Sequence, residues 1–342
     1  MAIFVKISCL IAAITGLAVI PEAGYSGAPF YEGKTIAIIV GASPGGGFDA
    51  YSRLIARHMS RHIPGKPNIV VQNMPGAGSL IAANHVYKVA KPDGLTIGHF
   101  LGGLFMQQLL GRPGVEFDAR KFEYLGVPTQ DNRVVGVSKA SGVISLEQWI
   151  ASKRTVKFGG VGPGAATDDI SKVLKATLGL QIQLVSGYKG SADIRLAFNS
   201  GEVQGICEAW ESLKATWRTE LESGDLIIIL QNTPKPLSDL PKVPLDINVA
   251  KTDEARKLIQ VAAHSVGQTY RPYVLPPGTP KDQAQILRKA FLDTLQDAAF
   301  LEEAKKAKLD INPLSGEELA QNVNRVLNLE PTLAAKLREI LR

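Results

Sequence analysis

The stretch "KTIAIIVGASPGGGFDAYSR", residues 34–53, contains the pattern that decides the fold. Its first half is a run of β-branched apolar residues, which is typical of a buried strand, and its second half is helix-like. Between them, Gly45, Gly47 and Ala50 match the G-x-G-x-x-A fingerprint of dinucleotide-binding folds. The same stretch also predicts, more simply, a helix N-terminus whose unpaired backbone N–H groups face an anion.

A dinucleotide fold needs a further residue that the sequence does not provide. In such folds the strand after the first helix ends in Asp or Glu, and this carboxylate binds a ribose hydroxyl. Here that strand, "IVVQN", ends in Gln72 and Asn73, and no G-K-[ST] follows the glycines as in a P-loop. We therefore expect no nucleotide cofactor. Two interpretations stay open: a tight turn without a ligand, or an anion site in which Asp49 orients the loop or binds water.

Length and composition describe a globular protein of about two domains. The chain has 342 residues, of which 45% are hydrophobic and 20% are charged, as in ordinary soluble proteins. Its net charge of +6 comes from 38 basic and 32 acidic residues, and no run of five basic residues occurs. This spacing argues against nucleic acid as a partner and favours small anionic solutes or an anionic membrane surface.

The N-terminus has the layout of a secretory signal peptide, which we place at residues 1–28. Lys6 is followed by an uncharged run from Ile7 to Ile20 and then by small residues. That run is shorter than the roughly 20 residues that a membrane-spanning helix needs. After cleavage only Cys207 remains, so we expect no intrachain disulfide in the exported chain, and Cys207 is expected to be a buried apolar residue.

Beyond the opening stretch, apolar strand-like runs lead repeatedly into glycine loops and then into helices. The predicted helices cover about residues 48–62, 80–90, 168–178 and 192–199. The alternation of strands and helices predicts parallel α/β sheets, in which ligands bind at the carboxyl ends of the strands. The segment from Lys281 onward is apolar at three- and four-residue spacing and is expected to pack as helices.

Two segments, residues 125–138 and 267–280, carry the prolines and glycines expected where a chain crosses between domains. In this interpretation the chain leaves the first domain near residue 130 and returns to it near residue 271. We therefore expect the first domain to comprise residues 29–130 and 271–342. The second domain is expected to comprise residues 131–270.

Several motifs in order along the chain resemble the solute-binding receptors of tripartite tricarboxylate transporters, also called Bug or TctC-like proteins. They are P-x-G-G-x-D at 44–49, "QNMPGAGSLIAAN" at 72–84, "PDGLTI" at 92–97, "GVGPGAAT" at 160–167, "YKGSAD" at 188–193, "GEVQ" at 201–204 and "LPPGTP" at 275–280. Together they cover nearly the whole mature chain. The resemblance implies an α/β fold of the periplasmic binding protein-like (type II) class, a Venus flytrap with a ligand cleft between two α/β domains.

The resemblance further implies a periplasmic receptor that captures a small organic carboxylate and delivers it to the membrane permease subunits of a transporter. It implies no catalysis and no cofactor, and we expect a monomer. Glycine loops of both domains would hold the ligand, and Glu208, at a strand end after "GEVQ", is a further candidate. The expected ligand-binding residues are Ser43, Gly46, Gly47, Phe48, Asp49, Gly162, Gly164, Ala165, Thr167, Tyr188, Lys189, Gly190 and Glu208.

Three positions depart from the family pattern. Ala165 stands where a serine is common, Asp168 where a histidine is frequent, and Phe48 where the family often has threonine. A lost donor and an added acid are expected to weaken the binding of di- or tricarboxylates. Phe48 favours an aromatic or less polar ligand.

Other charged residues have two interpretations each. Arg133 and Arg271 lie in the proposed crossings, where each either binds a carboxylate in the cleft or pairs between the domains. Arginines at positions 53, 57 and 61 recur every four residues and are expected to form a solvated helix face. His58 and His62 have the i, i+4 spacing of metal ligands, but no third ligand is evident, so we expect no metal.

No catalytic motif is evident, since G-x-S-x-G is absent and no Ser, His and Asp set stands in a suitable context. The alternatives to a transport receptor are an exported enzyme on the same scaffold and a sensor subunit that presents its ligand to a membrane kinase.

Overall fold

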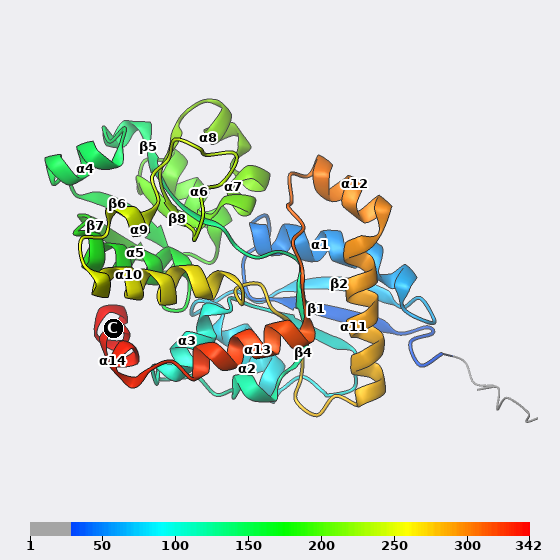
Figure 1. Cartoon of the computed structure of the whole chain (residues 1–342). Coiled ribbons are helices and arrows are strands. Elements are labelled where there is room, and N and C mark those ends of the chain that lie inside the picture. Colours follow the sequence, from blue (N-terminus) through cyan, green and yellow to red (C-terminus); the bar gives the residue numbers. More distant parts are fainter. Residues whose placement is uncertain (1–28) are drawn as a thin grey trace, which may run out of the picture.

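The structure is a computed structural model that describes residues 29–342, and the predicted signal peptide lies outside the described residues. The described chain forms two β-sheets with helices packed around them, which confirms the predicted α/β class (Figure 1). Among residues 29–342, no helix combines the length and the apolar character needed to cross a bilayer.

The first sheet has six strands in the order β11-β4-β10-β3-β1-β2. Its strands are β1 (Thr35–Val40), β2 (Asn68–Asn73), β3 (Thr96–His99), β4 (Glu123–Val127), β10 (Tyr273–Leu275) and β11 (Leu314–Ser315). Strand β1 pairs in parallel with β2 and β3. Its sequence "TIAIIV" is rich in β-branched residues, and Ile36, Ile38 and Val40 are fully buried, as expected for a central parallel strand.

Helices surround the first sheet and place the N-terminus of α1 at the end of β1. They are α1 (Gly47–Met59), α2 (Leu80–Lys88), α3 (Gly103–Leu109), α11 (Lys281–Gln296), α12 (Ala298–Lys306) and α13 (Gly316–Leu327), with short 3₁₀ turns η1 (Ser60–His62) and η2 (Ala119–Lys121). Helix α11 packs on α1 and β4, and α13 packs on β4 and α3. The predicted helical character of the C-terminal segment is thereby confirmed.

The second sheet has five strands in the order β7-β6-β8-β5-β9. Its strands are β5 (Arg133–Ser138), β6 (Val156–Gly160), β7 (Ile182–Ser186), β8 (Gly205–Ala209) and β9 (Leu226–Asn232). The helices of this half are α4 (Leu146–Ser152), α5 (Ala166–Leu178), α6 (Ser191–Asn199), α7 (Trp210–Thr216), α8 (Arg218–Glu222), α9 (Asp246–Val249) and α10 (Asp253–Ile259), with the 3₁₀ turn η3 (Lys139–Ser141) and the π-helical turn η4 (Gln260–Ser265). The last helix, α14 (Pro331–Leu341), packs on α5.

Both sheets are mixed, whereas the sequence predicts parallel ones. Strand β10 runs antiparallel to β3 and β4, and β5 runs antiparallel to β8 and β9. Each of these two strands follows a segment that passes from one sheet to the other. A strand that enters a sheet without a crossover helix is not held to the parallel direction, which explains the difference.

The two passing segments run side by side between the sheets. The backbone N–H of Asp131 donates to the carbonyl of Gly267 at 3.1 Å. A Cβ atom on Gly267 would lie 2.6 Å from the Asp131 carbonyl oxygen, so the approach leaves no room for a side chain there. This pair of segments joins the two sheets, and the link between α13 and α14, which packs on α5, passes between the halves a third time.

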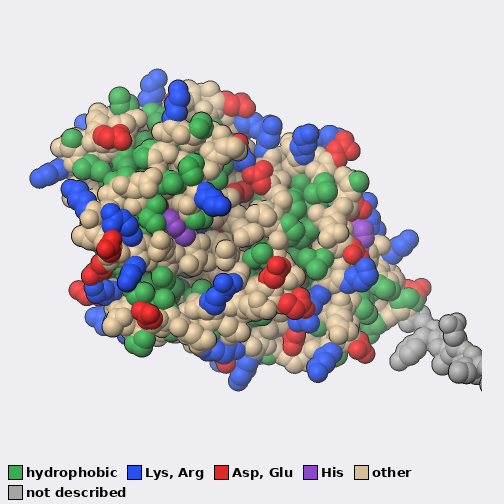
Figure 2. Space-filling model, in the orientation of Figure 1, with side chains coloured by type: hydrophobic (Ala, Val, Ile, Leu, Met, Phe, Trp, Pro, Cys, Tyr) green, Lys and Arg blue, Asp and Glu red, His purple; other side chains and the backbone are tan. Residues whose placement is uncertain are grey.

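Cys207 is fully buried on β8, as predicted, and burial raises the pKa of its thiol to about 12. On the face shown in Figure 2, Lys and Arg side chains are interspersed with Asp and Glu and do not gather in one basic patch.

Candidate ligand-binding site

A small pocket lies where the glycine loops of the two sheets meet. The first half contributes Gly46, Gly47 and Phe48, together with Gly41, Ala42 and Leu101. The second half contributes loop residues Val161, Ala165, Thr167, Gly190 and Ser191 and the side chains of Arg133, Glu208 and Tyr270. The enclosed volume is about 30 Å³, enough for roughly two water molecules.

Three helix N-termini converge on this pocket. Gly46, Ala165 and Gly190 are the N-cap residues of α1, α5 and α6, and all three line it. None of these three N-cap residues makes a side-chain capping hydrogen bond, although the first N–H of α5, that of Ala166, donates to the Tyr270 hydroxyl. The first backbone N–H groups of a helix have no partner within the helix, and its dipole is positive at this end. The pocket is therefore suited to an anion.

The first glycine loop is held in shape by Asp49, whose carboxylate turns back onto the loop. It accepts hydrogen bonds from the Gly45 N–H at 2.9 Å, from Arg53 Nε at 2.8 Å and from Asn73 Nδ2 at 3.0 Å. Burial alone would raise the pKa of Asp49, but these hydrogen bonds lower it. Asp49 does not line the pocket. Its two predicted roles are to orient the loop or to bind water, and these hydrogen bonds fit the first.

Two aspartates hold the second glycine loop in the same way. Asp168 Oδ2 accepts from the Gly162 N–H at 2.8 Å and from Thr167 Oγ1 at 3.0 Å. Asp169 accepts from the Gly164 N–H and, at 2.8 Å, from Gln107 Nε2 of α3. Asp168, which the sequence suggests adds an acid near the ligand, bonds to its own loop in this structure and does not line the pocket.

The third loop connects the halves through its backbone. The Ser43 N–H donates to the Lys189 carbonyl at 3.1 Å, and Ser43 Oγ donates to Asp193 at 2.5 Å. The Tyr188 hydroxyl donates to Glu202 at the surface, and the Lys189 side chain is exposed. Of the expected ligand-binding residues, those outside the pocket lining are Ser43, Asp49, Gly162, Gly164, Tyr188 and Lys189. Those that line it are Gly46, Gly47, Phe48, Ala165, Thr167, Gly190 and Glu208.

Two buried arginines share one carboxylate beside the pocket. Arg133 Nη2 lies 2.7 Å from Asp131 Oδ2, and Arg271 Nε donates to Asp131 Oδ1. Burial alone would lower the pKa of both arginines, but Asp131 raises it. Arg133 lines the pocket, while Arg271 lies behind it with Nη2 donating to Ser212 Oγ at 2.7 Å. Each arginine keeps one buried nitrogen, Nε of Arg133 and Nη1 of Arg271, without a partner among residues 29–342.

Aromatic rings complete the wall, and Tyr270 is the aromatic lining residue that the sequence prediction missed, along with the smaller residues Gly41, Ala42, Leu101, Val161 and Ser191. The Arg133 guanidinium lies 3.7 Å from the Tyr270 ring centroid, and the Tyr270 hydroxyl accepts from the Ala166 N–H at 2.6 Å. Phe48 stacks on His99 at 4.5 Å between ring centroids. The position of Tyr270 directly before Arg271, in the second crossing, is the signal that could have pointed to it.

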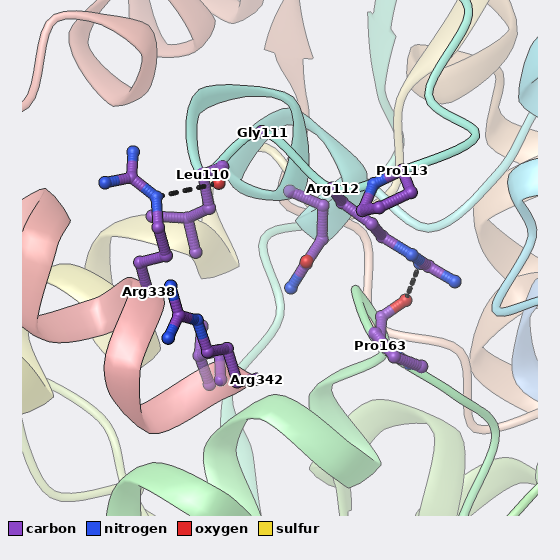
Figure 3. Close-up of a pocket in the computed structure, with 9 residues that line it drawn as sticks. Leu110, Gly111, Arg112, Pro113, Pro163, Arg338 and Arg342 are labelled. Carbon is purple, nitrogen blue, oxygen red and sulfur yellow. Dashed lines mark hydrogen bonds between the residues drawn. The ribbon is translucent and has the colours of Figure 1, made fainter.

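A larger pocket of about 330 Å³ lies on the other side of the second glycine loop (Figure 3). Arg112, Arg338 and Arg342 surround it, with Pro163 of the loop at its edge. The Arg112 guanidinium donates to the Pro163 carbonyl, and Arg338 Nε donates to the Leu110 carbonyl at 2.9 Å. These arginines therefore already bind backbone carbonyls, and no helix N-terminus opens into this pocket among the residues that line it.

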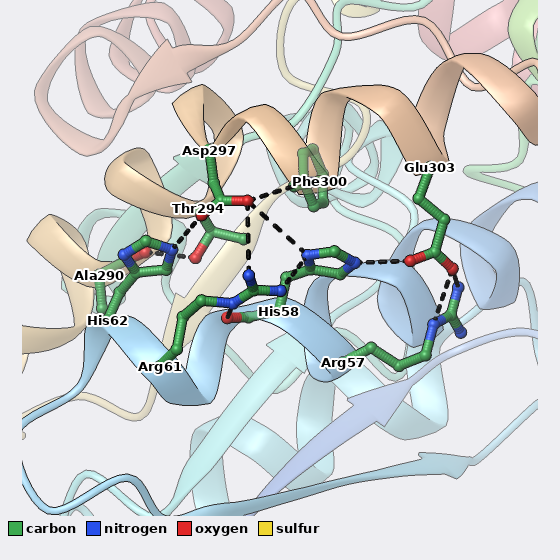
Figure 4. Close-up of polar contacts among 9 residues, drawn as sticks. All are labelled: Arg57, His58, Arg61, His62, Ala290, Thr294, Asp297, Phe300 and Glu303. Atoms are coloured by element: carbon green, nitrogen blue, oxygen red, sulfur yellow. Dashed lines mark hydrogen bonds and ion pairs between the residues drawn. The ribbon is translucent and has the colours of Figure 1, made fainter.

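The arginine stripe is exposed to solvent, as expected, and its members also form surface ion pairs, two of which are drawn in Figure 4. Arg57 donates to Glu303, and Arg61 lies 3.7 Å from Asp297, both on the α12 side. His58 Nε2 is 2.6 Å from Glu303, and His62 Nε2 is 3.4 Å from Asp297. Within residues 29–342, no group of three or more His, Cys, Asp or Glu side chains has the arrangement of a metal site.

Comparison with known sequences finds relatives of low identity. The family model described as "Tripartite tricarboxylate transporter family receptor" matches residues 52–337. A UPF0065 protein of Cupriavidus necator, from the gbd 5′ region, is 24% identical over 338 residues, covering 95% of this chain and 93% of that protein. A UPF0065 protein of Agrobacterium vitis is 27% identical over 219 residues, and this match spans 63% of the chain but only 61% of that relative.

Comparison with solved structures finds the same fold. The periplasmic binding protein BugD superposes with a TM-score of 0.74 at 20% identity, covering 91% of this chain and 98% of that one. The R. palustris protein Rpa4515 with adipate superposes with a TM-score of 0.71 at 20% identity, covering 90% of this chain and 97% of that one. MatC from Rhodopseudomonas palustris with bound malate superposes with a TM-score of 0.69 at 19% identity, covering 90% of this chain and 99% of that one. The predicted fold class, that of the periplasmic binding proteins, is confirmed.

Proposed function

Because this chain belongs to the receptor family of tripartite tricarboxylate transporters, we propose that it captures a small organic carboxylate in the pocket between its two sheets. The observation that carries the proposal is the convergence of the N-termini of α1, α5 and α6 on one pocket. Their backbone N–H groups and dipoles favour a carboxylate. Structural relatives solved with adipate and with bound malate support this ligand class.

We propose that binding closes two domains around the ligand. The first domain comprises residues 29–130 and 271–342, and the second comprises residues 131–270. The strands support this division, since those of the first sheet lie within 35–127 and 273–315 and those of the second within 133–232. The enclosed space of about 30 Å³ is smaller than an organic carboxylate needs, so in this proposal the domains part at the two crossing segments to admit the ligand.

The proposed ligand contacts are the backbone N–H groups at Gly46, Gly47 and Gly190, with Ala165, Phe48, Thr167 and Glu208 as side-chain contacts. The residues that hold the loops in shape, above all Asp49, affect binding by fixing the positions of these N–H groups. The loaded protein would be a periplasmic monomer that delivers its ligand to the membrane permease subunits without converting it. The family relationship and the layout of residues 1–28 support export.

The test is thermal unfolding of the purified protein with mono-, di- and tricarboxylates, aromatic acids, NAD and ATP, followed by calorimetric titration of each hit. A ligand at about 100 times its Kd adds roughly 2.7 kcal/mol to the stability, a rise of several degrees in Tm. We expect carboxylates alone to give this rise and the recovered ligand to be chemically unchanged. A rise in Tm with NAD or ATP and none with carboxylates would overturn the proposal. A chemically converted ligand would favour the alternative of an exported enzyme on the same scaffold.

A further inference from the structure

The pocket contains an acidic side chain that a site for a simple anion does not need. Glu208 lies at the end of β8, opposite Val134 of β5, and its half-buried side chain lines the pocket. It shares this lining with the N-cap residues Gly46, Ala165 and Gly190. One small cavity therefore holds both a carboxylate and three positive helix ends.

Glu208 has no direct salt-bridge partner among residues 29–342. Its Oε1 accepts from the Ala209 N–H at 2.8 Å, and no Lys, Arg or His of these residues forms an ion pair with it. Arg133, which also lines the pocket, is committed to Asp131 at 2.7 Å. Burial raises the pKa of Glu208, and the charge of Arg133 opposes that rise without a direct contact.

The charges around the pocket are balanced before a ligand enters. The two guanidinium groups of Arg133 and Arg271 are matched by the carboxylates of Asp131 and Glu208. The helix N-termini supply the remaining positive potential, which suits one ligand carboxylate. A second ligand carboxylate would share a small cavity with Glu208, and two carboxylates in one site repel each other.

We propose that the ligand of this pocket is an amino-carboxylate: one carboxylate faces the helix N-termini, and a protonated amine binds Glu208. This inference rests on the proposed function and narrows its ligand class. An ammonium group donates charge-assisted hydrogen bonds to Glu208 and removes the repulsion that a dicarboxylate would meet. Glu208 is thus the residue that selects against simple dicarboxylates.

The experiment uses calorimetric titration of the purified protein with three matched ligand series of two to six carbons: α- and ω-amino acids, the dicarboxylates, and the monocarboxylates. We expect an amino acid to bind at least about tenfold more tightly than the dicarboxylate of equal length, the size of one charge-assisted hydrogen bond. A dicarboxylate that binds as tightly as every amino acid would overturn this inference and leave the proposed function standing. Binding of no carboxylate in any series would overturn both.

Glu208→Gln tests the residue itself, since it keeps the shape and removes the charge. We expect this variant to lose about tenfold in affinity for the amino acid and to gain affinity for the dicarboxylate of equal length. Glu222→Gln, at an exposed acid at the end of α8, is the matched control and is expected to change neither. An unchanged ligand preference in a Glu208→Gln protein with wild-type thermal unfolding would contradict the assignment.

Discussion

Asp131 shows how single residues organise the centre of this molecule. Its carboxylate is completely buried and receives Arg133 from one crossing segment and Arg271 from the other. Breaking a buried pair leaves an uncompensated charge, which costs far more than the pair contributes relative to apolar residues. The sequence places both arginines in the crossings, but nothing local indicates that a single aspartate satisfies the two.

Glu211, next to this cluster, predicts a pH dependence of stability. Burial raises its pKa from 4.5 to about 7, and the charge of Asp131 adds to the effect. Between these values the folded protein binds more protons than the unfolded chain, so this contribution to stability is lost as the pH rises from about 4.5 to 7. The wild type should lose unfolding free energy between pH 5 and pH 8. We expect Glu211→Gln, measured by urea unfolding at both pH values, to lose about 1 to 3 kcal/mol less than the wild type does.

The exposed-acid variant Glu222→Gln serves as the control for this measurement, because it removes a carboxyl group outside the buried cluster. If Glu211→Gln and wild type lose the same stability between the two pH values, Glu211 is not the titrating group.

At the scale of elements, the helices divide into capped and uncapped ones. Helices α4, α10, α12 and α13 begin with a side-chain cap, and α13 has a complete capping box of Ser315 and Glu318. The other helices lack such a cap, and three of these, α1, α5 and α6, begin at Gly or Ala and point their N-termini at the pocket. What distinguishes these three is their shared direction, which brings their positive ends to one place.

Contacts between elements of the two halves are expected to hold the closed form. Lys214 of α7 lies 2.6 Å from Asp310, which follows α12, so this ion pair joins the second half to the first. We expect Lys214→Met to weaken ligand binding by about two- to fivefold at low salt, as for a partly exposed pair. The difference should vanish at about 1 M salt because the pair is then screened.

Titrations of Lys88→Met provide the comparison, because the Lys88–Glu116 pair at 2.8 Å lies within the first half. This variant should bind as the wild type does. Equal losses in both variants would show that the Lys214–Asp310 pair has no special part in closure.

At the scale of the whole molecule, glycines allow the two halves to touch. A Cβ atom on Gly47 of α1 would lie 2.8 Å from Ser212 Cβ of α7, in the opposite half. We expect Gly47→Ala to keep the protein folded, since Ala is a better helix former, but to hold the halves apart and lower ligand affinity at least tenfold. Small-angle X-ray scattering with saturating ligand should then show a larger radius of gyration than for the wild type.

Relief of the clash provides the second arm of this test. Adding Ser212→Gly to Gly47→Ala removes the side chain that the new methyl group meets, and it should restore compaction by the ligand. Ser212→Gly alone controls for the loss of the Arg271 hydrogen bond. Compaction of the single Gly47→Ala variant equal to that of the wild type would argue against closure at this contact.

The sequence by itself determined the local units of this protein. The helices predicted at 48–62, 80–90, 168–178 and 192–199 correspond to α1 with η1, α2, α5 and α6, within about two residues at each end. The glycine loops before three of them, α1, α5 and α6, supply pocket residues. Such units are readable because strand alternation, helical periodicity and glycine punctuation act between residues close in the chain.

Only the tertiary structure decided which side chains face the pocket and which brace its loops. Asp49 and Asp168 look like ligand contacts in sequence but bond to their own loops, while Tyr270 enters the wall from a distant segment. Arg57 and Arg61 find their partners in α12 and at its N-cap, about 240 residues away. A charged side chain takes its partner from whatever the fold brings within a few ångströms, and separation along the chain carries no information about that distance.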